Sequence, residues 1–337
     1  MSRALNSVLS LLSQFALFLS SVPAAAYPQT VAQHAPSPPG VLINVASHHL
    51  HLYCTGRGTP TVLLEAGAGD FSFDWSLVQP SIASVTRVCS YDRAGYAWSE
   101  PGPSPRTIRQ IAAELRALLT NAHEPPPYVL VGHSLGGLYV RLYAVTHPAE
   151  VAGLVLIEAT HEDNPIMLNG QVRLLRSMSR GRQIPAVRLG MSPDDSVVGG
   201  PEPQPSPPTL DPPYDKLPPD VQRVRLWAMT APRYVAARSS EFDYLPEEMK
   251  QIYDQRAQGE GSLEDLPLVV LTRKDAPPDH AARQADLATL SRNSKLEIAT
   301  TTDHHIQLAD PESVVRATTE VVAAVRQNAP LTPGHRR

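Results

Sequence analysis

Short runs of apolar residues alternate along this chain with stretches in which apolar residues recur every three or four positions. The periodic stretches predict amphipathic helices, as in Ile108, Ile111, Leu115 and Leu118, and a last helix should begin at Asp310 with Pro311 in its first turn. The short runs predict strands at 41–45, 49–54, 61–65, 86–91, 128–131, 151–157, 266–271 and 295–299. This alternation predicts an α/β fold, with a mostly parallel central sheet and helices on both faces.

One stretch, 161–265, shows no succession of strand and helix and holds the Pro-dense segment 201–208. It lies between two predicted strands, so we expect an insertion that covers the end of the sheet as a helical, Pro-rich cap. A disordered surface insertion is the alternative for its centre. The expected organisation is a core of 41–160 and 266–327, a cap of 161–265 and a tail of 328–337.

The amino-terminal residues have the pattern of an export signal. Arg3 precedes an apolar run from Leu5 to Leu19, and Val22–Ala26 before Tyr27 fits an Ala-x-Ala cleavage pattern. We therefore expect a signal peptide over 1–26, a disordered Pro-rich leader over 27–40, and a secreted or periplasmic protein. The alternative is retention as an amino-terminal membrane anchor, although the run is short for a bilayer span.

Composition narrows the classes of partner. The chain has 337 residues, 42% of them hydrophobic and 18% charged, and a net charge of −4. A nucleic-acid partner needs a concentrated patch of Lys and Arg, which the sequence lacks. We therefore expect no nucleic-acid partner, and we expect no stable membrane partner either. No metal, nucleotide or flavin signature occurs, so we also expect no cofactor.

The candidate chemistry centres on Ser134, which stands between Gly132 and Gly136 where a predicted strand meets a predicted helix. In a sharp strand-to-helix turn the serine hydroxyl is exposed, and small residues on either side let strand and helix approach. The N–H of Leu135, at the start of the helix, favours negative charge beside the serine. The small-residue loop 66–69 is able to turn a second backbone N–H toward Ser134.

Four segments, 64–69, 91–96, 132–136 and 304–308, together resemble the α/β-hydrolase fold superfamily, in particular its serine, esterase-like branch with a cap insertion. The resemblance covers about 41–327, apart from the divergent cap. It implies that Ser134 is a nucleophile and that the N–H groups of Leu135 and Ala68 form an oxyanion hole. A histidine is usual before Gly67 in this family, and here that residue is Ala66.

The resemblance also implies the other members of a catalytic triad. The general base stands seven residues before the Pro that opens the last helix, which indicates His304, with the neighbouring His305 as the alternative. The acid follows either the strand after the nucleophile helix, where Glu158 stands, or the next strand, where Asp275 stands. Glu158 aligns without a gap and is favoured. Asp92 and Arg93 are expected to be structural, and His133 to pack beside the turn.

The fold implied by the resemblance makes the second and fourth strands antiparallel neighbours. Cys54 ends the second and Cys89 lies in the fourth, so we expect a disulfide between them, which export permits. Two buried free thiols are the alternative.

These features favour a serine hydrolase that cleaves small-molecule carboxylic esters through an acyl-enzyme on Ser134, with His304 as general base. A Ser at the turn argues against the dehalogenase and epoxide-hydrolase members of the superfamily, which use a carboxylate nucleophile. Two other functions remain open. One is a ligand-binding module with little turnover, and the other is acyl transfer to an acceptor other than water.

Overall fold

The computed structural model describes residues 35–168, 171–178 and 210–331. The described residues from Pro36 onward belong to one compact unit, which carries the fold. The predicted signal peptide, most of the leader and the Pro-dense segment 201–208 lie outside the described residues. At the end of the leader, the indole Nε1 of Trp98 donates to the carbonyl of Pro36 at 2.6 Å.

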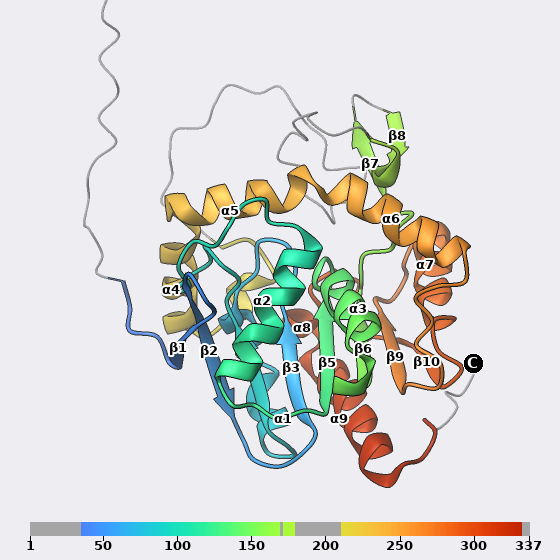
Figure 1. Ribbon diagram of the computed structural model, residues 1–337, viewed down its shortest axis with the longest axis horizontal. Helices are drawn as coiled ribbons and strands as arrows, with labels where there is room; N and C mark the ends of the chain where they lie inside the picture. The colour runs from blue at the N-terminus through green and yellow to red at the C-terminus, as the bar shows by residue number, and fades with distance from the viewer. Residues whose placement is uncertain (1–34, 169–170, 179–209, 332–337) are drawn as a thin grey trace, which may run out of the picture. The chain divides into compact units, whose positions relative to one another are not determined.

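An eight-stranded sheet forms the centre of the molecule, in the order β1-β2-β4-β3-β5-β6-β9-β10 (Figure 1). β2 pairs antiparallel with both β1 and β4, and the pairs from β4 to β10 are parallel. The strands are β1 (Val41–Asn44), β2 (His49–Thr55), β3 (Thr61–Glu65), β4 (Val88–Tyr91), β5 (Tyr128–His133), β6 (Val151–Ile157), β9 (Leu268–Thr272) and β10 (Ser294–Ile298). The predicted mostly parallel sheet is confirmed.

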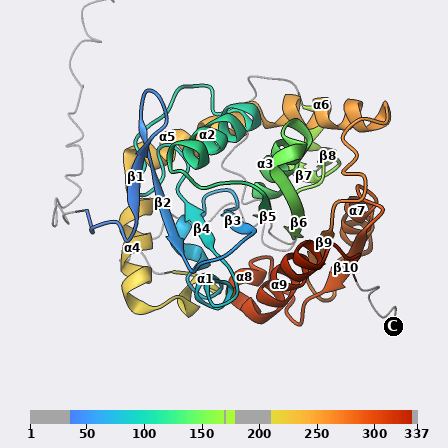
Figure 2. The same cartoon turned by 60° about the horizontal axis from the view of Figure 1, so that its bottom comes forward.

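Helices cover both faces of this sheet (Figure 2). On one face α2 (Ile108–Asn121), α3 (Gly136–Thr146) and α7 (Pro278–Ala288) cover a core that includes Leu63, Leu130 and Leu154. On the other face α1 (Gln79–Ala83), α8 (Ile306–Ala309) and α9 (Pro311–Gln327) cover a core that includes Val62, Val131 and Val155. Because successive side chains of a strand point to opposite faces, one apolar run supplies both cores.

Local capping residues set where the predicted helices begin. The Thr107 hydroxyl accepts from the Gln110 N–H at 3.1 Å at the start of α2. The Asp310 carboxylate accepts from the Ser313 N–H at 3.2 Å at the start of α9, where Pro311 occupies the first helical position. Capping side chains therefore mark the start of α2 and of α9.

The cap is helical in the main, as the sequence predicts, and lies above the carboxyl ends of the strands (Figure 1). Its described elements are β7 (Pro165–Leu168), β8 (Gln171–Leu174), α4 (Pro219–Met229), α5 (Pro232–Asp243) and α6 (Leu245–Ala257), with single 3₁₀ turns η3 (Leu175–Ser177) and η5 (Tyr214–Lys216). The antiparallel β7–β8 pair was not predicted. Two core turns, η1 (Ser72–Trp75) and η2 (Pro148–Glu150), complete the described elements.

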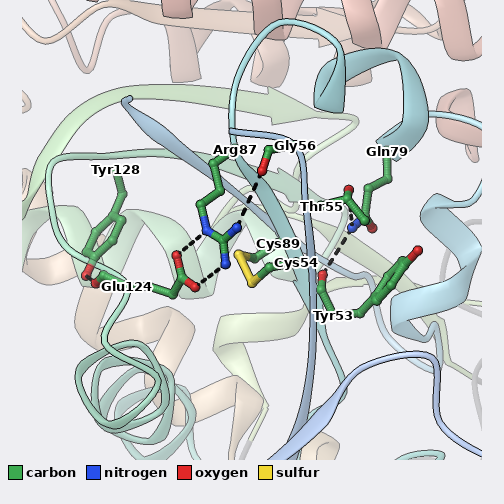
Figure 3. Close-up of a disulfide and its surroundings, with 9 residues drawn as sticks. All are labelled: Tyr53, Cys54, Thr55, Gly56, Gln79, Arg87, Cys89, Glu124 and Tyr128. Carbon is green, nitrogen blue, oxygen red and sulfur yellow. Dashed lines mark hydrogen bonds and ion pairs between the residues drawn. A yellow bond between two sulfur atoms is a disulfide. The ribbon is translucent and has the colours of Figure 1, made fainter. Parts of the chain in front are cut away.

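The cysteines lie on adjacent antiparallel strands, where Cys54 of β2 is in register with Cys89 of β4. Their sulfur atoms are 2.03 Å apart and form a disulfide (Figure 3). Beside it, Arg87 and Glu124 form an ion pair with an Nη2–Oε1 distance of 2.5 Å. The bond thus joins the antiparallel edge of the sheet to its parallel part.

No helix in the described part of the chain is long and apolar enough to cross a membrane. The apolar run from Leu5 to Leu19 lies outside that part.

Candidate active site

Ser134 lies at the turn between β5 and α3, and its backbone has a φ of +50°. This left-handed conformation is costly for a residue with a side chain, and the neighbouring hydrogen bonds hold it in place. The Ser134 N–H donates to the carbonyl of Ile157 at 3.0 Å, and its carbonyl accepts from the Thr160 N–H at 2.9 Å. Ile157 ends β6 and Thr160 follows it by three residues, so the adjacent strand and the loop after it fix the turn.

The glycines on either side of Ser134 are required by close packing. A Cβ on Gly132 would come within 2.7 Å of Val140 Cγ2 and 2.8 Å of the Gly136 carbonyl oxygen. A Cβ on Gly136 would come within 2.7 Å of the carbonyl oxygens of Glu65 and Ala66. The loop between β3 and η1 (66–71), called the β3 loop from here on, therefore lies directly against the turn that carries Ser134.

The two backbone N–H groups predicted to form an oxyanion hole are those of Leu135 and Ala68. Neither donates to an acceptor among the described residues. Leu135 is buried, whereas Ala68 and Ser134 are half-buried, so solvent reaches this part of the turn. Free N–H groups in a compact region are unusual, because buried backbone donors almost always find partners.

His304 lies between β10 and α8, and its Nδ1 is 3.3 Å from Oε2 of Glu158. The carboxylate can only accept, so Nδ1 carries the proton and Nε2 is left with a free lone pair. Burial lowers the pKa of His304 to about 4, and the bond to Glu158 opposes only part of that effect. The imidazole is therefore neutral, and able to accept a proton, at neutral pH.

Glu158, at the end of β6, is buried and accepts from five donors. Burial by itself would raise the pKa of Glu158, but the bonds from His280 and His304 outweigh it and hold that pKa well below its usual range. The other contacts are the hydroxyl of Thr272 at 2.8 Å, the backbone N–H of Arg273 at 2.9 Å, Nη1 of Arg273 at 2.9 Å and Nε2 of His280 at 3.1 Å. Glu158 is a fixed anion beside His304.

The two alternatives from the sequence do not share the contact between His304 and Glu158, although the ring centroids of His305 and His304 are 5.3 Å apart. Asp275 is exposed in the turn after β9 and forms no hydrogen bond or ion pair with a histidine of the described chain. The Nε2 of His305 is 2.7 Å from the hydroxyl of Tyr214 in the cap, and its Nδ1 is 3.5 Å from Oδ1 of Asp303. Asp303 and Asp70 raise the pKa of His305 although burial opposes them. The structure thus places Glu158 against His304. It places neither Glu158 nor Asp275, the two candidate triad acids, against His305.

His133 packs beside the turn, as the sequence predicts, and also contacts the segment that carries His304. Its Nε2 donates to the carbonyl oxygen of His304 at 3.0 Å, and the two ring centroids are 4.8 Å apart. Its Nδ1 lies 3.2 Å from Nε2 of Gln307 and 3.4 Å from Oδ2 of Asp70. Because His133 directly precedes Ser134, this bond holds the two histidine-bearing segments together at the site.

A buried polar cluster connects the cap to the β3 loop next to these histidines. The hydroxyl of Tyr214 donates to Oδ1 of Asp70 at 2.6 Å, and Nη2 of Arg225 reaches the same oxygen at 3.3 Å. Arg225 also pairs with Asp74. Burial alone would raise the pKa of Asp70, but His133, His305 and Arg225 outweigh burial and hold that pKa well below its usual range. The cap is fixed by charge to the loop that carries Ala68.

Asp92 and Arg93 are both buried and hydrogen-bonded, which agrees with the structural role expected of them. The Asp92 carboxylate accepts from Nδ1 of His51 at 2.8 Å and from the Ser72 N–H at 2.8 Å. Arg93 contacts the β3 loop and the cap, as described below.

In the described part of the chain, the group of side chains best placed to hold a metal ion consists of Cys54, Cys89 and Glu124. Both sulfurs are used in the disulfide, and Glu124 pairs with Arg87 (Figure 3). This group offers no free thiolate to a metal.

Sequence reasoning missed the residues that surround the acid and those that the cap contributes. Thr272, Arg273 and His280 come from the end of β9 and the start of α7, a helix that was not predicted. A signal was present, since Arg273 follows a buried strand as Glu158 does, and parallel neighbours bring their carboxyl ends together. Tyr214 and Arg225 carry no such signal.

Comparison with known proteins shows the family of the chain. A family model described as the alpha/beta hydrolase fold matches residues 59–308, and the chain belongs to that family. A curated relative, the pyrrolizixenacetamide deacetylase of Xenorhabdus hominickii, is 29% identical over 147 residues, which are 42% of this chain and 55% of the relative. The chain spans only 18% to 42% of the length of other curated relatives.

Solved structures share the fold at low sequence identity. The enol-lactonase of Burkholderia xenovorans LB400 is 15% identical with a TM-score of 0.59, over 84% of this chain and 100% of that one. A Vigna radiata epoxide hydrolase mutant is 15% identical with a TM-score of 0.60, over 84% of this chain and 98% of that one. At such identities the likeness shows the fold alone.

Proposed function

We propose that this protein is a serine hydrolase that cleaves small-molecule carboxylic esters through an acyl-enzyme on Ser134. The proposal is supported by three observations: Ser134 has a left-handed backbone, His304 is bonded to the buried Glu158, and His133, the residue before Ser134, contacts the carbonyl of His304. The N–H groups of Leu135 and Ala68 donate to no acceptor among the described residues. These are the parts that acyl transfer needs: a nucleophile, a base, a group that orients the base, and donors for an oxyanion.

In the first half of the reaction, the Ser134 hydroxyl oxygen bonds to the ester carbonyl carbon and its proton passes to Nε2 of His304. The carbonyl electron pair moves onto oxygen, where the N–H groups of Leu135 and Ala68 stabilise the charge. Glu158 keeps the proton on Nδ1 of His304 and favours the imidazolium that forms. When the oxyanion collapses, the C–O bond to the alcohol breaks and the alcohol takes the proton from His304.

In the second half, water attacks the acyl carbon while His304 accepts its proton. Collapse of the second oxyanion returns the proton to Ser134 and releases the carboxylic acid. A Ser at the turn fits this acyl chemistry and not the alkyl-enzyme chemistry of a carboxylate nucleophile, although epoxide hydrolases share the fold.

We propose in addition that the protein is exported. The amino-terminal signal pattern supports this, and so does the disulfide, because such bonds persist in oxidising compartments.

Replacement of the nucleophile tests the proposal. Ser134→Ala should lower kcat/KM for p-nitrophenyl esters by about 10⁴-fold or more, because triad members act as a unit. Circular dichroism and thermal unfolding should match the unsubstituted protein, since Ser134 is half-buried and its side chain packs into neither core. In the same experiment, a fluorophosphonate probe should label the unsubstituted protein on Ser134, as found by mass spectrometry. An Ala variant that retains most of its activity would remove the proposal.

A further inference from the structure

A buried arginine contacts the loop that carries one of the two free N–H groups. Nη1 of Arg93 donates to the carbonyl of Ala66 at 2.8 Å, and Nη2 donates to the carbonyl of Gly67 at 2.8 Å. Arg93 is only 2% exposed. Its guanidinium therefore lies under the β3 loop and holds two successive carbonyl groups.

The second of these bonds fixes the direction of the Ala68 N–H. The Gly67 carbonyl and the Ala68 N–H belong to one peptide unit, which is planar and trans, so the two groups point in opposite directions. With the carbonyl held by Arg93, the N–H must point away from the guanidinium. A rotated peptide would turn a carbonyl oxygen toward the site, where it would repel an oxyanion.

The same loop contacts the chain on both sides of Ser134, at His133 and at Gly136. A Cβ on Gly67 would come within 2.7 Å of Nδ1 of His133, and the carbonyls of Glu65 and Ala66 lie against Gly136. The peptide that Arg93 orients is thus next to the nucleophile turn.

Arg93 is itself held from the cap. Its Nε donates to Oε1 of Glu241 at 2.9 Å and its Nη2 lies 3.4 Å from Oε2 of that residue in α5. Nη1 also donates to Oε1 of Glu65 at 2.9 Å. The five donors of the guanidinium therefore have five acceptors, two of them backbone carbonyls and three of them carboxylate oxygens. The hydroxyl of Tyr96 donates to Glu241 at 2.9 Å and fixes its position.

On this basis we propose that Arg93 and Glu241 are positioning residues for the oxyanion hole, and that the cap, through Glu241, holds the Ala68 peptide in its productive orientation. The inference rests on the proposed function. It assigns to the cap a part in transition-state stabilisation, in addition to covering the site. A lysine at position 93 keeps the charge but has three N–H donors on one nitrogen, against the five acceptors that the planar guanidinium of Arg93 contacts.

The test compares Arg93→Lys and Glu241→Gln with a control pair. Arg106 and Glu114 form a similarly buried ion pair, 2% and 5% exposed with an Nη2–Oε2 distance of 2.6 Å, but Arg106 makes no bond to the β3 loop. Arg106→Lys and Glu114→Gln therefore report what breaking a buried pair does to the fold in general.

Steady-state kinetics with p-nitrophenyl butyrate gives the first readout. Arg93→Lys should lower kcat by about 10- to 100-fold, somewhat less than the loss of a whole oxyanion donor, with KM nearly unchanged. The Ki of a trifluoromethyl ketone, which adds to the serine and forms an oxyanion, should rise by the same factor. Glu241→Gln should act in the same direction with a smaller effect, and the controls should leave both quantities within about twofold, since Arg106 and Glu114 do not touch the loop.

Amide hydrogen exchange gives a readout that does not depend on activity. Arg93→Lys should speed exchange in the peptide that contains residues 65–70, and Arg106→Lys should not. Unchanged exchange in that peptide, or a kcat loss without a matching loss of ketone affinity, would overturn the inference. If the unsubstituted protein hydrolyses no ester, the proposed function fails, whereas the exchange experiment still decides whether Arg93 orders the loop.

Discussion

At the scale of single residues, Glu158 shows how a buried carboxylate is kept ionised. Its two oxygens accept from five donors, so its negative charge is compensated without water. Asp275, the other acid that the sequence allows, is exposed and has no histidine partner in the described chain. The two candidates therefore differ in environment far more than their sequence positions indicate.

Substitution of each acid separates them. Glu158→Gln should lower kcat substantially, because an amide in that position no longer stabilises the imidazolium of His304. Asp275→Asn should leave kcat close to that of the unsubstituted protein. Kinetics with one p-nitrophenyl ester measures both variants side by side. The reverse order of effects would make Asp275 the acid, and small losses in both would mean that neither orients the base.

The pKa of His304 predicts the acid limb of the pH profile. The neutral imidazole is the active form, and burial lowers the pKa of His304 from 6.5 to about 4. Activity should therefore be lost only as the pH falls through about 4, and kcat/KM should be flat from about pH 5 to 8. A series of kcat/KM values at constant ionic strength, with activity checked after return to neutral pH, measures this limb. A limb at the ordinary histidine value would show that burial does not lower the pKa of His304 in the active enzyme.

At the scale of elements, the antiparallel pairing of β2 with β4 places Cys54 opposite Cys89. The bond closes a loop spanning 35 positions of sequence separation, and such a closure stabilises a protein by roughly 3–4 kcal/mol in the chain-entropy estimate. Cys54→Ser combined with Cys89→Ser should lower the free energy of unfolding by about that amount. Urea denaturation under oxidising conditions measures the difference.

The control for this prediction is the unsubstituted protein after reduction, which should lose the same stability. Peptide mapping without reductant, on protein taken from an oxidising compartment, should recover the two cysteines in one linked peptide. Recovery of both as freely alkylated thiols would show that the bond does not form there.

The eight strands of the central sheet and the helices α2, α3 and α9 were predictable from sequence because each has a local cause. The runs at β3, β5 and β6 are apolar throughout, as strands buried on both faces must be. The start of α9 is fixed by Asp310 and Pro311. By contrast β7 and β8 are four residues each, and three residues of β8 are exposed, so neither shows a regular pattern. Short exposed strands depend on pairing, which a single segment does not reveal.

The residues of the candidate site were predictable from sequence to a similar degree, and for a similar reason. Ser134 and Leu135 belong to a local motif, and Ala68, His304 and Glu158 follow strands whose ends a parallel sheet brings together. The donors around Glu158 and the cap residues near His305 come from contacts between distant segments. Arg93 was recognised only as structural, since its bonds to Ala66, Gly67 and Glu241 depend on how the cap docks.

At the scale of the whole molecule, the cap is joined to the core by buried charge. Arg225 of α4 is 4% exposed and pairs with Asp70 and Asp74, which are 3% and 1% exposed. Removing one partner of a buried ion pair leaves an uncompensated charge, which costs far more than the loss of an exposed pair.

Arg225→Met tests this joint, because methionine keeps much of the side-chain volume without the charge. The free energy of unfolding should fall by about 3–5 kcal/mol. Arg292→Met is the matched control, since the Arg292–Asp265 pair is 72% and 69% exposed and should be worth at most about 1 kcal/mol. Chemical denaturation of both variants measures the difference. Equal small losses in both variants would show that the ion pairs of Arg225 with Asp70 and Asp74 add little to the free energy of unfolding.

The bond from Glu241 to Arg93 has a consequence for recombination between members of this family. A chimera that receives a foreign cap keeps Arg93 but loses its Nε acceptor unless the donor sequence supplies a carboxylate where α5 places Glu241. Exchange of the inserted segment alone therefore does not preserve the contact between cap and core, because that contact needs both Arg93 and a carboxylate in the new cap. Caps that bring such a carboxylate should give active chimeras more often than caps of equal similarity that lack it, and that one position offers a criterion for choosing donors.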